Sequence, residues 1–159
     1  MKKIVSLFGV LFLVFFQTAC SNNLENTDLS NIRLDNMKIG DKISEEDLSK
    51  YNESDKYIKE TKYTFEEICI NVDDKEQINY LFARFDEYYI DININDTNNL
   101  NLIKDIENIL GNNFQDKKYD SEQLLREYIY IDKVNNLKAE FIYSQNTNIL
   151  RWIILRKQY

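Results

Sequence analysis

The chain of 159 residues carries 20 lysines and arginines against 27 aspartates and glutamates, with no histidine, no proline and only three glycines. The lack of histidine excludes Ser-His and Cys-His nucleophilic pairs and imidazole metal ligands, and three scattered glycines cannot build a phosphate-binding loop. We therefore expect no metal or other cofactor, and a net charge of −7 argues against nucleic acid as a partner, because nucleic-acid binders depend on a basic surface.

The first twenty residues have the pattern of an export signal. Two lysines precede an apolar run of 13 residues, 4–16, which is too short to cross a hydrocarbon core that needs about 20. Residues 18–20, Thr-Ala-Cys, resemble the lipobox of bacterial lipoproteins, with Gln17 where family members usually carry leucine. The resemblance implies that residues 1–19 are a lipoprotein signal peptide and that Cys20, acylated on its sulfur, anchors the chain in the membrane. Ordinary signal-peptide cleavage beside an incidental cysteine is the alternative.

Residues 20–36 are polar, as expected of a flexible tether behind the lipidated cysteine. Removal of residues 1–19 takes away two lysines and no acid, so the net charge of the mature chain is −9. An anionic membrane repels such a body, which should stand off from the lipid rather than lie flat. With Cys20 acylated, Cys69 is the only free thiol, so an internal disulfide is excluded.

The rest of the chain matches itself at an offset of about 59 residues. Residues 70–74 fall on 129–133, and the apolar positions that follow coincide without a gap. Self-similarity of this kind is typical of a duplicated structural unit. We predict two tandem repeats, one at 37–95 and the other at 96–159.

Each repeat is predicted to be a helical segment followed by three strands. The first helix begins at the capping-box signature of residues 44–47, and the second has an apolar stripe from Leu102 to Leu110 and ends at Gly111. Alternation with period two predicts strands at 68–72, 78–82, 88–94, 129–131, 137–143 and 149–155. The predicted fold class is α+β, with the two three-stranded antiparallel meanders forming a sheet and the helices on one face.

Two segments, 39–48 and 106–111, carry a family resemblance. They look like the opening of glycine, helix and leucine-glycine found in the BamE/SmpA and β-lactamase-inhibitor-protein superfamily, whose repeat is a helical segment packed on an antiparallel meander. The resemblance covers residues 37–159. It implies an envelope lipoprotein or a secreted binder, and it transfers no binding residue to this chain.

Residues 91–98 alternate oxygen-bearing side chains as a calcium-binding loop does. However, Asp96 stands where such a loop needs glycine, and Leu102 stands where it needs a bidentate glutamate. Ile92 and Ile94 instead fit a buried strand face. We therefore interpret this stretch as a strand followed by a turn.

Adjacent carboxylates, of the kind that serve glycosidases, occur at residues 45–46, 66–67 and 73–74. Acidic pairs at helix starts and hairpin turns are typical of solvated structural positions. We therefore predict no catalytic site.

The sheet face turned away from the helices is the predicted binding site. If Ile129 and Ile153 meet the helices, then aromatic side chains gather on the opposite face. An uncovered face is normally polar, whereas tyrosine and tryptophan dominate protein–protein hot spots. A face covered by another segment, or a reversed assignment of the two faces, is the alternative. The predicted partner-binding residues are Phe85, Tyr89, Tyr128, Tyr130, Leu150 and Trp152.

Three functions compete at this point. The first is a non-catalytic, lipid-anchored lipoprotein on the extracytoplasmic face of the cell membrane that binds another protein through its sheet. The second is an inhibitor or immunity lipoprotein that neutralises an extracytoplasmic hydrolase or toxin, for which the acidic charge suits a basic attacker. The third, a wall-glycan hydrolase that uses carboxylates alone, is least favoured because the chain has no histidine and few glycines.

Overall fold

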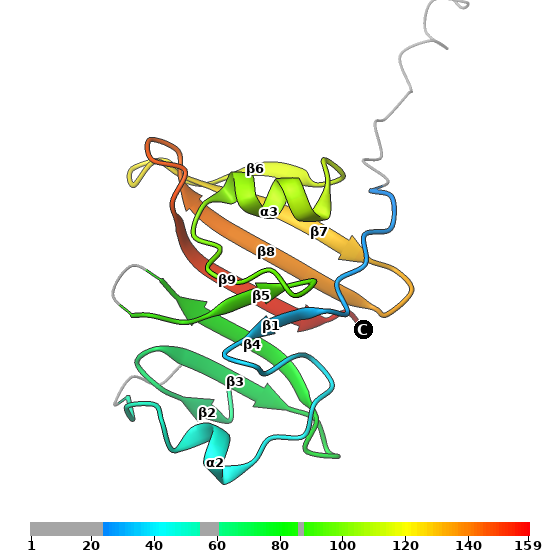
Figure 1. The fold of residues 1–159 in the computed structure, drawn as a ribbon, viewed down its shortest axis with the longest axis vertical. Helices are drawn as coiled ribbons and strands as arrows, with labels where there is room; N and C mark the ends of the chain where they lie inside the picture. Colours follow the sequence, from blue (N-terminus) through cyan, green and yellow to red (C-terminus); the bar gives the residue numbers. More distant parts are fainter. Residues whose placement is uncertain (1–23, 55–60, 86–87) are drawn as a thin grey trace, which may run out of the picture.

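The computed structural model describes residues 24–54, 61–85 and 88–159 (Figure 1). The predicted signal peptide and Cys20 lie outside the described residues. In chain order, the elements are β1 (Ile32–Leu34), α2 (Glu45–Leu48), β2 (Tyr63–Thr64), β3 (Ile68–Val72), β4 (Ile78–Arg84), β5 (Ile92–Ile94), α3 (Ile103–Leu110), β6 (Gln115–Asp120), β7 (Leu125–Asp132), β8 (Leu137–Ser144) and β9 (Leu150–Lys157).

Seven of the strands form one antiparallel sheet in the order β2-β3-β4-β9-β8-β7-β6. The hairpins β3–β4 and β7–β8 confirm the strands predicted in those two places, and the turns between them lie at residues 73–77 and 133–136. Strand β9 lies between β4 and β8 and joins the two halves, with Ala83 opposite Ile153 and Phe141 opposite the same Ile153. The sheet therefore runs through both predicted repeats.

The predicted α+β class is wrong, because the molecule is mostly β. Helices do form where the two helical segments were predicted, and Ser44 and Asp47 make the expected reciprocal capping box at the start of α2. However, α2 has four residues and α3 has eight. Helix nucleation is costly, and such short apolar stripes cover little of a seven-stranded sheet.

The third strand of the first predicted meander does not join the large sheet. Strand β5 pairs instead with β1 in a separate two-stranded sheet, with Ile32 opposite Ile94 and Leu34 opposite Ile92. All four of these side chains are buried. The prediction of a strand and turn at residues 91–98 is confirmed, but its hydrogen-bonding partner is the N-terminal segment rather than β4.

The prediction of a flexible tether over residues 20–36 is wrong for the part that the structure describes. The N–H of Glu25 donates to Asn113 Oδ1 at 3.0 Å, and the N–H of Thr27 donates to the carbonyl oxygen of Ile131 at 2.9 Å. Leu29 is buried, and its N–H donates to the carboxylate of Asp132 at 3.0 Å. Hydrogen bonds and burial thus fix the segment from Glu25 onward against strand β7 and the β7–β8 turn.

One face of the seven-stranded sheet, called here the inner face, packs against β1, β5 and α3, which lie over it in Figure 1. The buried side chains of these three elements all belong to one apolar cluster with inner-face residues of the sheet. The inner-face members of that cluster on the three central strands, β4, β9 and β8, are Ile78, Leu81, Ala83, Leu137, Ala139, Phe141, Tyr143, Leu150, Ile153 and Leu155.

Candidate functional site

The opposite side of the seven-stranded sheet is called here the open face. Among the residues that the structure describes, every buried apolar side chain outside the large sheet belongs to the inner cluster. The buried side chains on the open face belong to the sheet itself and include Cys69, Ile129 and Ile142. The strand pairing places on the open face Cys69, Asn71, Tyr80, Phe82, Arg84, Glu127, Ile129, Lys138, Glu140, Ile142, Trp152, Ile154 and Arg156.

Two of the predicted binding residues, Tyr128 and Tyr130, lie on the inner face instead. Tyr130 has no exposed surface, and its hydroxyl donates to the carbonyl oxygen of Gly111 at 3.0 Å. Tyr128 stacks on Phe114 with ring centroids 3.7 Å apart and meets Tyr143 edge-on at 5.1 Å. Both rings belong to the apolar layer beneath the loop that follows α3. Their assignment to the binding face is therefore wrong.

Leu150 and Trp152 were predicted to share a face, and the structure separates them. Leu150 is buried in the inner cluster, whereas Trp152 lies on the open face opposite Ile142. The reason is a β-bulge at this point, where the register shifts and Arg151 has no cross-strand partner of its own. An extra residue in a strand resets the alternation of side chains, so the prediction is correct for Trp152 and wrong for Leu150.

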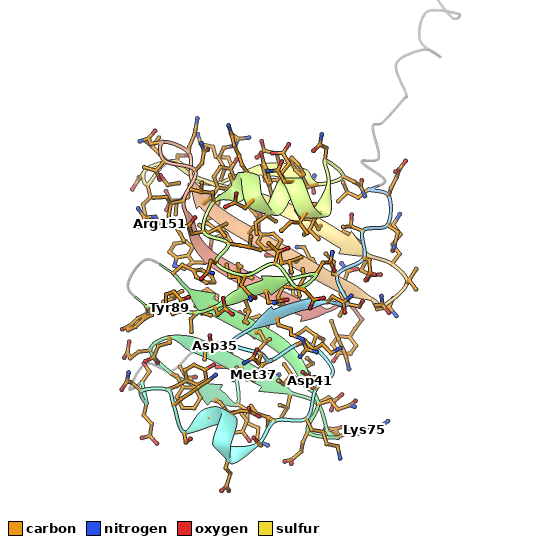
Figure 2. The ribbon with its side chains drawn as sticks, in the orientation of Figure 1. Asp35, Met37, Asp41, Lys75, Tyr89 and Arg151 are labelled. Atoms are coloured by element: carbon orange, nitrogen blue, oxygen red, sulfur yellow. The ribbon has the colours of Figure 1, made fainter. Side chains whose placement is uncertain are left out.

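The two residues predicted from the first half, Phe85 and Tyr89, do not join the open face either. Phe85 is half-buried and packs against the inner cluster. Tyr89 is 81% exposed, and its hydroxyl donates to Asn99 Oδ1 at 3.1 Å. Figure 2 shows Tyr89 at the periphery of the molecule. The six predicted residues therefore form no common patch.

Besides Trp152, the open face has aromatic residues that the sequence analysis did not identify. Trp152 and Phe82 are half-buried, and Tyr119 at the end of β6 is 48% exposed. The Tyr119 ring lies 5.6 Å from the Trp152 ring, and the Arg84 guanidinium lies 5.8 Å from the centre of the Phe82 ring. Tyr80 extends this surface along β4.

A second bulge explains why strict alternation from Ile78 would place Tyr80 and Phe82 on the inner face, whereas the structure has them on the open face. The register shifts between Asn71 and Val72, so that Val72 lies opposite Ile78 while Asn71 lies opposite Tyr80. Ile78 and Leu81, three positions apart, are consequently both buried in the inner cluster. The signal available in the sequence was this spacing of three between apolar residues, which strict alternation does not allow.

Charged side chains beside the aromatic residues form a compact network. Glu140 is bound by Lys138 and by Arg156, whose Nη2 lies 2.6 Å from its Oε1. Burial by itself raises the pKa of Glu140, but the two cations outweigh it, so this pKa lies below its ordinary value. Glu127 is raised in pKa by burial and by the negative charge of Glu140. At neutral pH the network therefore favours the ionised form of Glu140 and disfavours that of Glu127.

The acidic pairs noted in the sequence take part in local structure. Glu66 accepts from Ser54 Oγ and from the hydroxyl of Tyr88, and Glu67 accepts from the N–H of Asn52. Asp73 accepts from two backbone N–H groups inside the β3–β4 turn, and these bonds hold the pKa of its carboxyl below the ordinary value. Within the described residues, no group of three or more acidic or cysteine side chains is arranged to hold a metal ion.

Among the residues that the structure describes, none of the helices has the length and apolarity needed to cross a bilayer. Comparison with models of protein families, with curated proteins and with solved structures yields no match to this chain. The resemblance to the BamE/SmpA and β-lactamase-inhibitor-protein superfamily therefore stays a prediction from the sequence.

Proposed function

We propose that the chain is a non-catalytic lipoprotein, anchored through acyl chains on Cys20 at the extracytoplasmic face of the cell membrane, that binds a protein partner through the open face of its sheet. The observation that carries the binding part is a sheet face on which Trp152, Phe82 and Tyr80 are half-buried and Tyr119 is 48% exposed. A sheet face meant only for solvent is normally polar, and a contiguous aromatic surface marks an interaction site.

The composition of the open face supports a protein as the partner. Trp152, Tyr119 and Tyr80 lie beside Arg84 and Arg156, and tryptophan, tyrosine and arginine are the residues that most often carry the binding energy of interfaces. Strands β4 and β9, which hold four of the five, are central to the sheet and paired on both sides. Their side chains are therefore presented on a rigid support, which lowers the entropy lost on binding.

Membrane attachment is supported by the N-terminal pattern, which lies outside the described residues. The basic start, the apolar run of 4–16 and the cysteine at position 20 agree in order and spacing. Two or more acyl chains give stable anchoring, whereas one chain holds a protein only marginally. Mass spectrometry of the mature N-terminus tests this part directly. We expect a chain that begins at Cys20 with its sulfur acylated, and a mature chain that begins elsewhere would contradict the anchor.

The binding face is tested by two variants of the full chain. Trp152→Ala with Tyr119→Ala removes the aromatic pair of the open face, and Tyr89→Ala removes an exposed aromatic residue that lies outside it. Cross-linking in intact envelopes, followed by purification and mass spectrometry, identifies the partner, and titration calorimetry with the purified partner then measures affinity. Truncation at an interface hot spot costs about 2 kcal/mol or more, roughly 30-fold in Kd. We expect this loss for the double variant and unchanged affinity for Tyr89→Ala.

Circular dichroism of both variants excludes unfolding as the cause of lost binding. Equal affinity of the double variant and the parent chain would place the binding site elsewhere on the molecule. The alternative function, an inhibitor or immunity lipoprotein, is favoured by the net charge of −9 of the mature chain, which accelerates encounter with a basic partner. It predicts that the captured protein is a hydrolase or toxin and that its activity falls on binding.

A further inference from the structure

The attachment of the N-terminal segment limits the distance between the membrane and one part of the fold. Glu25 is the first residue with a described hydrogen bond, to Asn113, and Asn26 accepts from the backbone N–H groups of Lys133 and Val134 at 2.6 and 3.2 Å. Five Cα–Cα steps separate Cys20 from Glu25. Even fully extended, they span at most about 18 Å. An acylated Cys20 therefore holds this corner of the molecule close to the lipid surface.

The charges of the mature chain are distributed very unevenly along the sequence. Residues 41–96, which contain α2 and β2–β5, hold 16 acidic and seven basic residues, a net charge of −9. Residues 97–159, which contain α3 and β6–β9, hold eight acidic and nine basic residues, a net charge of +1. The first range is called here the acidic half and the second the neutral half.

These two halves are also separate in space. Figure 1 shows α2, β2 and β3 at one end of the molecule and α3, β6 and β7 at the other, with the segment that follows residue 24 beside β7. Strand β3 is four positions from β7 in the sheet, which corresponds to about 19 Å at the spacing of paired strands. The anchored corner, with Asn113 and the β7–β8 turn, belongs to the neutral half.

We propose that the lipid-anchored chain takes a defined orientation on an anionic membrane, with the β7–β8 turn and the loop before β6 facing the lipid and the acidic half directed away from it. This inference rests on the proposed acyl anchor at Cys20. The anchor and the charge distribution act in the same direction, because the short connection holds the neutral half down while the negative surface potential repels the acidic half. The edge of the open face along β6 and β7 then lies nearest the membrane.

The reach of the connection also argues against the inverted arrangement. With the acidic half on the lipid, the corner at Glu25 would stand off by about the width of four to five strands, about 19–24 Å, beyond the limit of about 18 Å. A flat arrangement would lay the acidic half, with its net charge of −9, against the anionic surface. Its charges within about 8 Å of the lipid, the Debye length at physiological salt, would then be repelled. Only the upright arrangement satisfies both constraints.

The orientation is measurable with single-tryptophan variants of the mature chain, residues 20–159, which retains every described residue. Trp152 is the only native tryptophan and is replaced by phenylalanine. Val134→Trp then places a probe on the β7–β8 turn, where Val134 is 76% exposed, and Lys75→Trp places one on the exposed β3–β4 turn of the acidic half (Figure 2). Each chain is coupled through the Cys20 sulfur to a maleimide lipid in vesicles made of equal parts of phosphatidylcholine and phosphatidylglycerol with brominated acyl chains.

We expect bromine to quench the Val134→Trp probe several-fold more than the Lys75→Trp probe. Equal quenching of the two probes, or stronger quenching of the Lys75→Trp probe, would overturn the proposed orientation. An insertion of twenty glycine and serine residues between Asn23 and Leu24 serves as the matched control, and it should reduce quenching of the Val134→Trp probe. Unchanged quenching after the insertion would show that the short connection does not set the orientation.

The outcome of this experiment is separable from that of the proposed function. Chemical coupling at Cys20 supplies the lipid whether or not cells acylate the cysteine, so mass spectrometry of the natural N-terminus and vesicle quenching can fail independently. Cys69 is buried, and burial raises the pKa of its thiol, so it competes little for the maleimide. Circular dichroism of each variant checks its fold. If the Trp152→Phe chain does not fold, quenching is measured at native Trp152 in the unsubstituted chain.

Discussion

Replacement of Asp132 by asparagine tests the contact that fixes the N-terminal segment to the fold. Asp132 has no exposed surface. Its Oδ1 accepts from the N–H groups of Val134 at 3.0 Å and Asn135 at 2.9 Å, and its Oδ2 accepts from the N–H of Leu29 at 3.0 Å and from Asn135 Nδ2 at 2.7 Å. One carboxylate thus satisfies donors of both the β7–β8 turn and the segment that follows the proposed anchor.

The size of the effect follows from the donors that the substitution leaves without an acceptor. An asparagine amide keeps one oxygen and turns an NH₂ group toward the donors that the other oxygen had served, so at least two hydrogen bonds are lost. A buried donor left unsatisfied costs about 1–3 kcal/mol. We expect Asp132→Asn to lower the free energy of unfolding by about 3 kcal/mol, a large part of the 5–15 kcal/mol typical of a domain.

The matched control is Asp116→Asn. Asp116 forms a bidentate ion pair with Arg126, and about one-third of each of these two side chains is exposed. Exposed ion pairs contribute about 1 kcal/mol or less. Urea unfolding followed by Trp152 fluorescence measures both variants. Equal losses for the two variants, or a loss below about 1 kcal/mol for Asp132→Asn, would refute the assigned role of Asp132.

The same variant has a defined pH dependence. Although burial alone would raise the pKa of Asp132, the hydrogen bonds from Asn135, Leu29 and Val134 outweigh it and hold the pKa below its ordinary value. The folded state therefore favours the ionised carboxylate, which stabilises the protein above a pH of about 4 and ceases to do so as the pH falls further. The unfolding free energy of Asp132→Asn should depend less on pH in this acidic range than that of the parent chain.

Four further substitutions test the inner and the open face. Tyr130→Phe removes only the hydroxyl bound to the Gly111 carbonyl and should cost about 1 kcal/mol of stability. Tyr130→Ala leaves a cavity at a fully buried site and should cost about 3–5 kcal/mol. A negligible loss for Tyr130→Ala would contradict the burial of this ring in the inner layer. On the open face, Glu140→Gln should destabilise at pH 7, because the folded state favours the ionised form of Glu140. Glu127→Gln should be neutral or stabilising, because the folded state disfavours its charge. Chemical denaturation of both glutamine variants at pH 7 measures these signs, and a stabilising Glu140→Gln would contradict the proposed network.

Much of the local structure could be predicted, because its determinants are short-range. The capping box at Ser44 and the stop at Gly111 locate both helices, and alternation of apolar residues locates the β3–β4 and β7–β8 hairpins. The predicted fold class was wrong because the local patterns locate helices and strands but do not determine how long each helix is or which strands pair. The pairing of β5 with β1 depends on residues about sixty positions apart, and no local pattern encodes it.

The residues of the open face were only partly predicted from the sequence. Trp152 is on the open face as expected, while Tyr128, Tyr130 and Leu150 are in the inner layer. Isoleucine and tyrosine are both common in strands, so composition alone does not decide which of two alternating sets faces the core. The outcome at Leu150 further depends on a bulge, whose extra residue reverses the alternation beyond it.

The sequence by itself supplied the prediction of an export signal that ends at Cys20, and it determined the uneven charge and the positions of most strands, because each of these depends on neighbouring residues. Only the tertiary structure decided that residues from Glu25 onward belong to the fold, that β9 joins the two halves, and that the open face carries Tyr80, Phe82 and Trp152. These features arise from long-range pairing and from two local shifts of register. Their stability depends on burial by segments distant in the chain, which periodicity along the chain does not record.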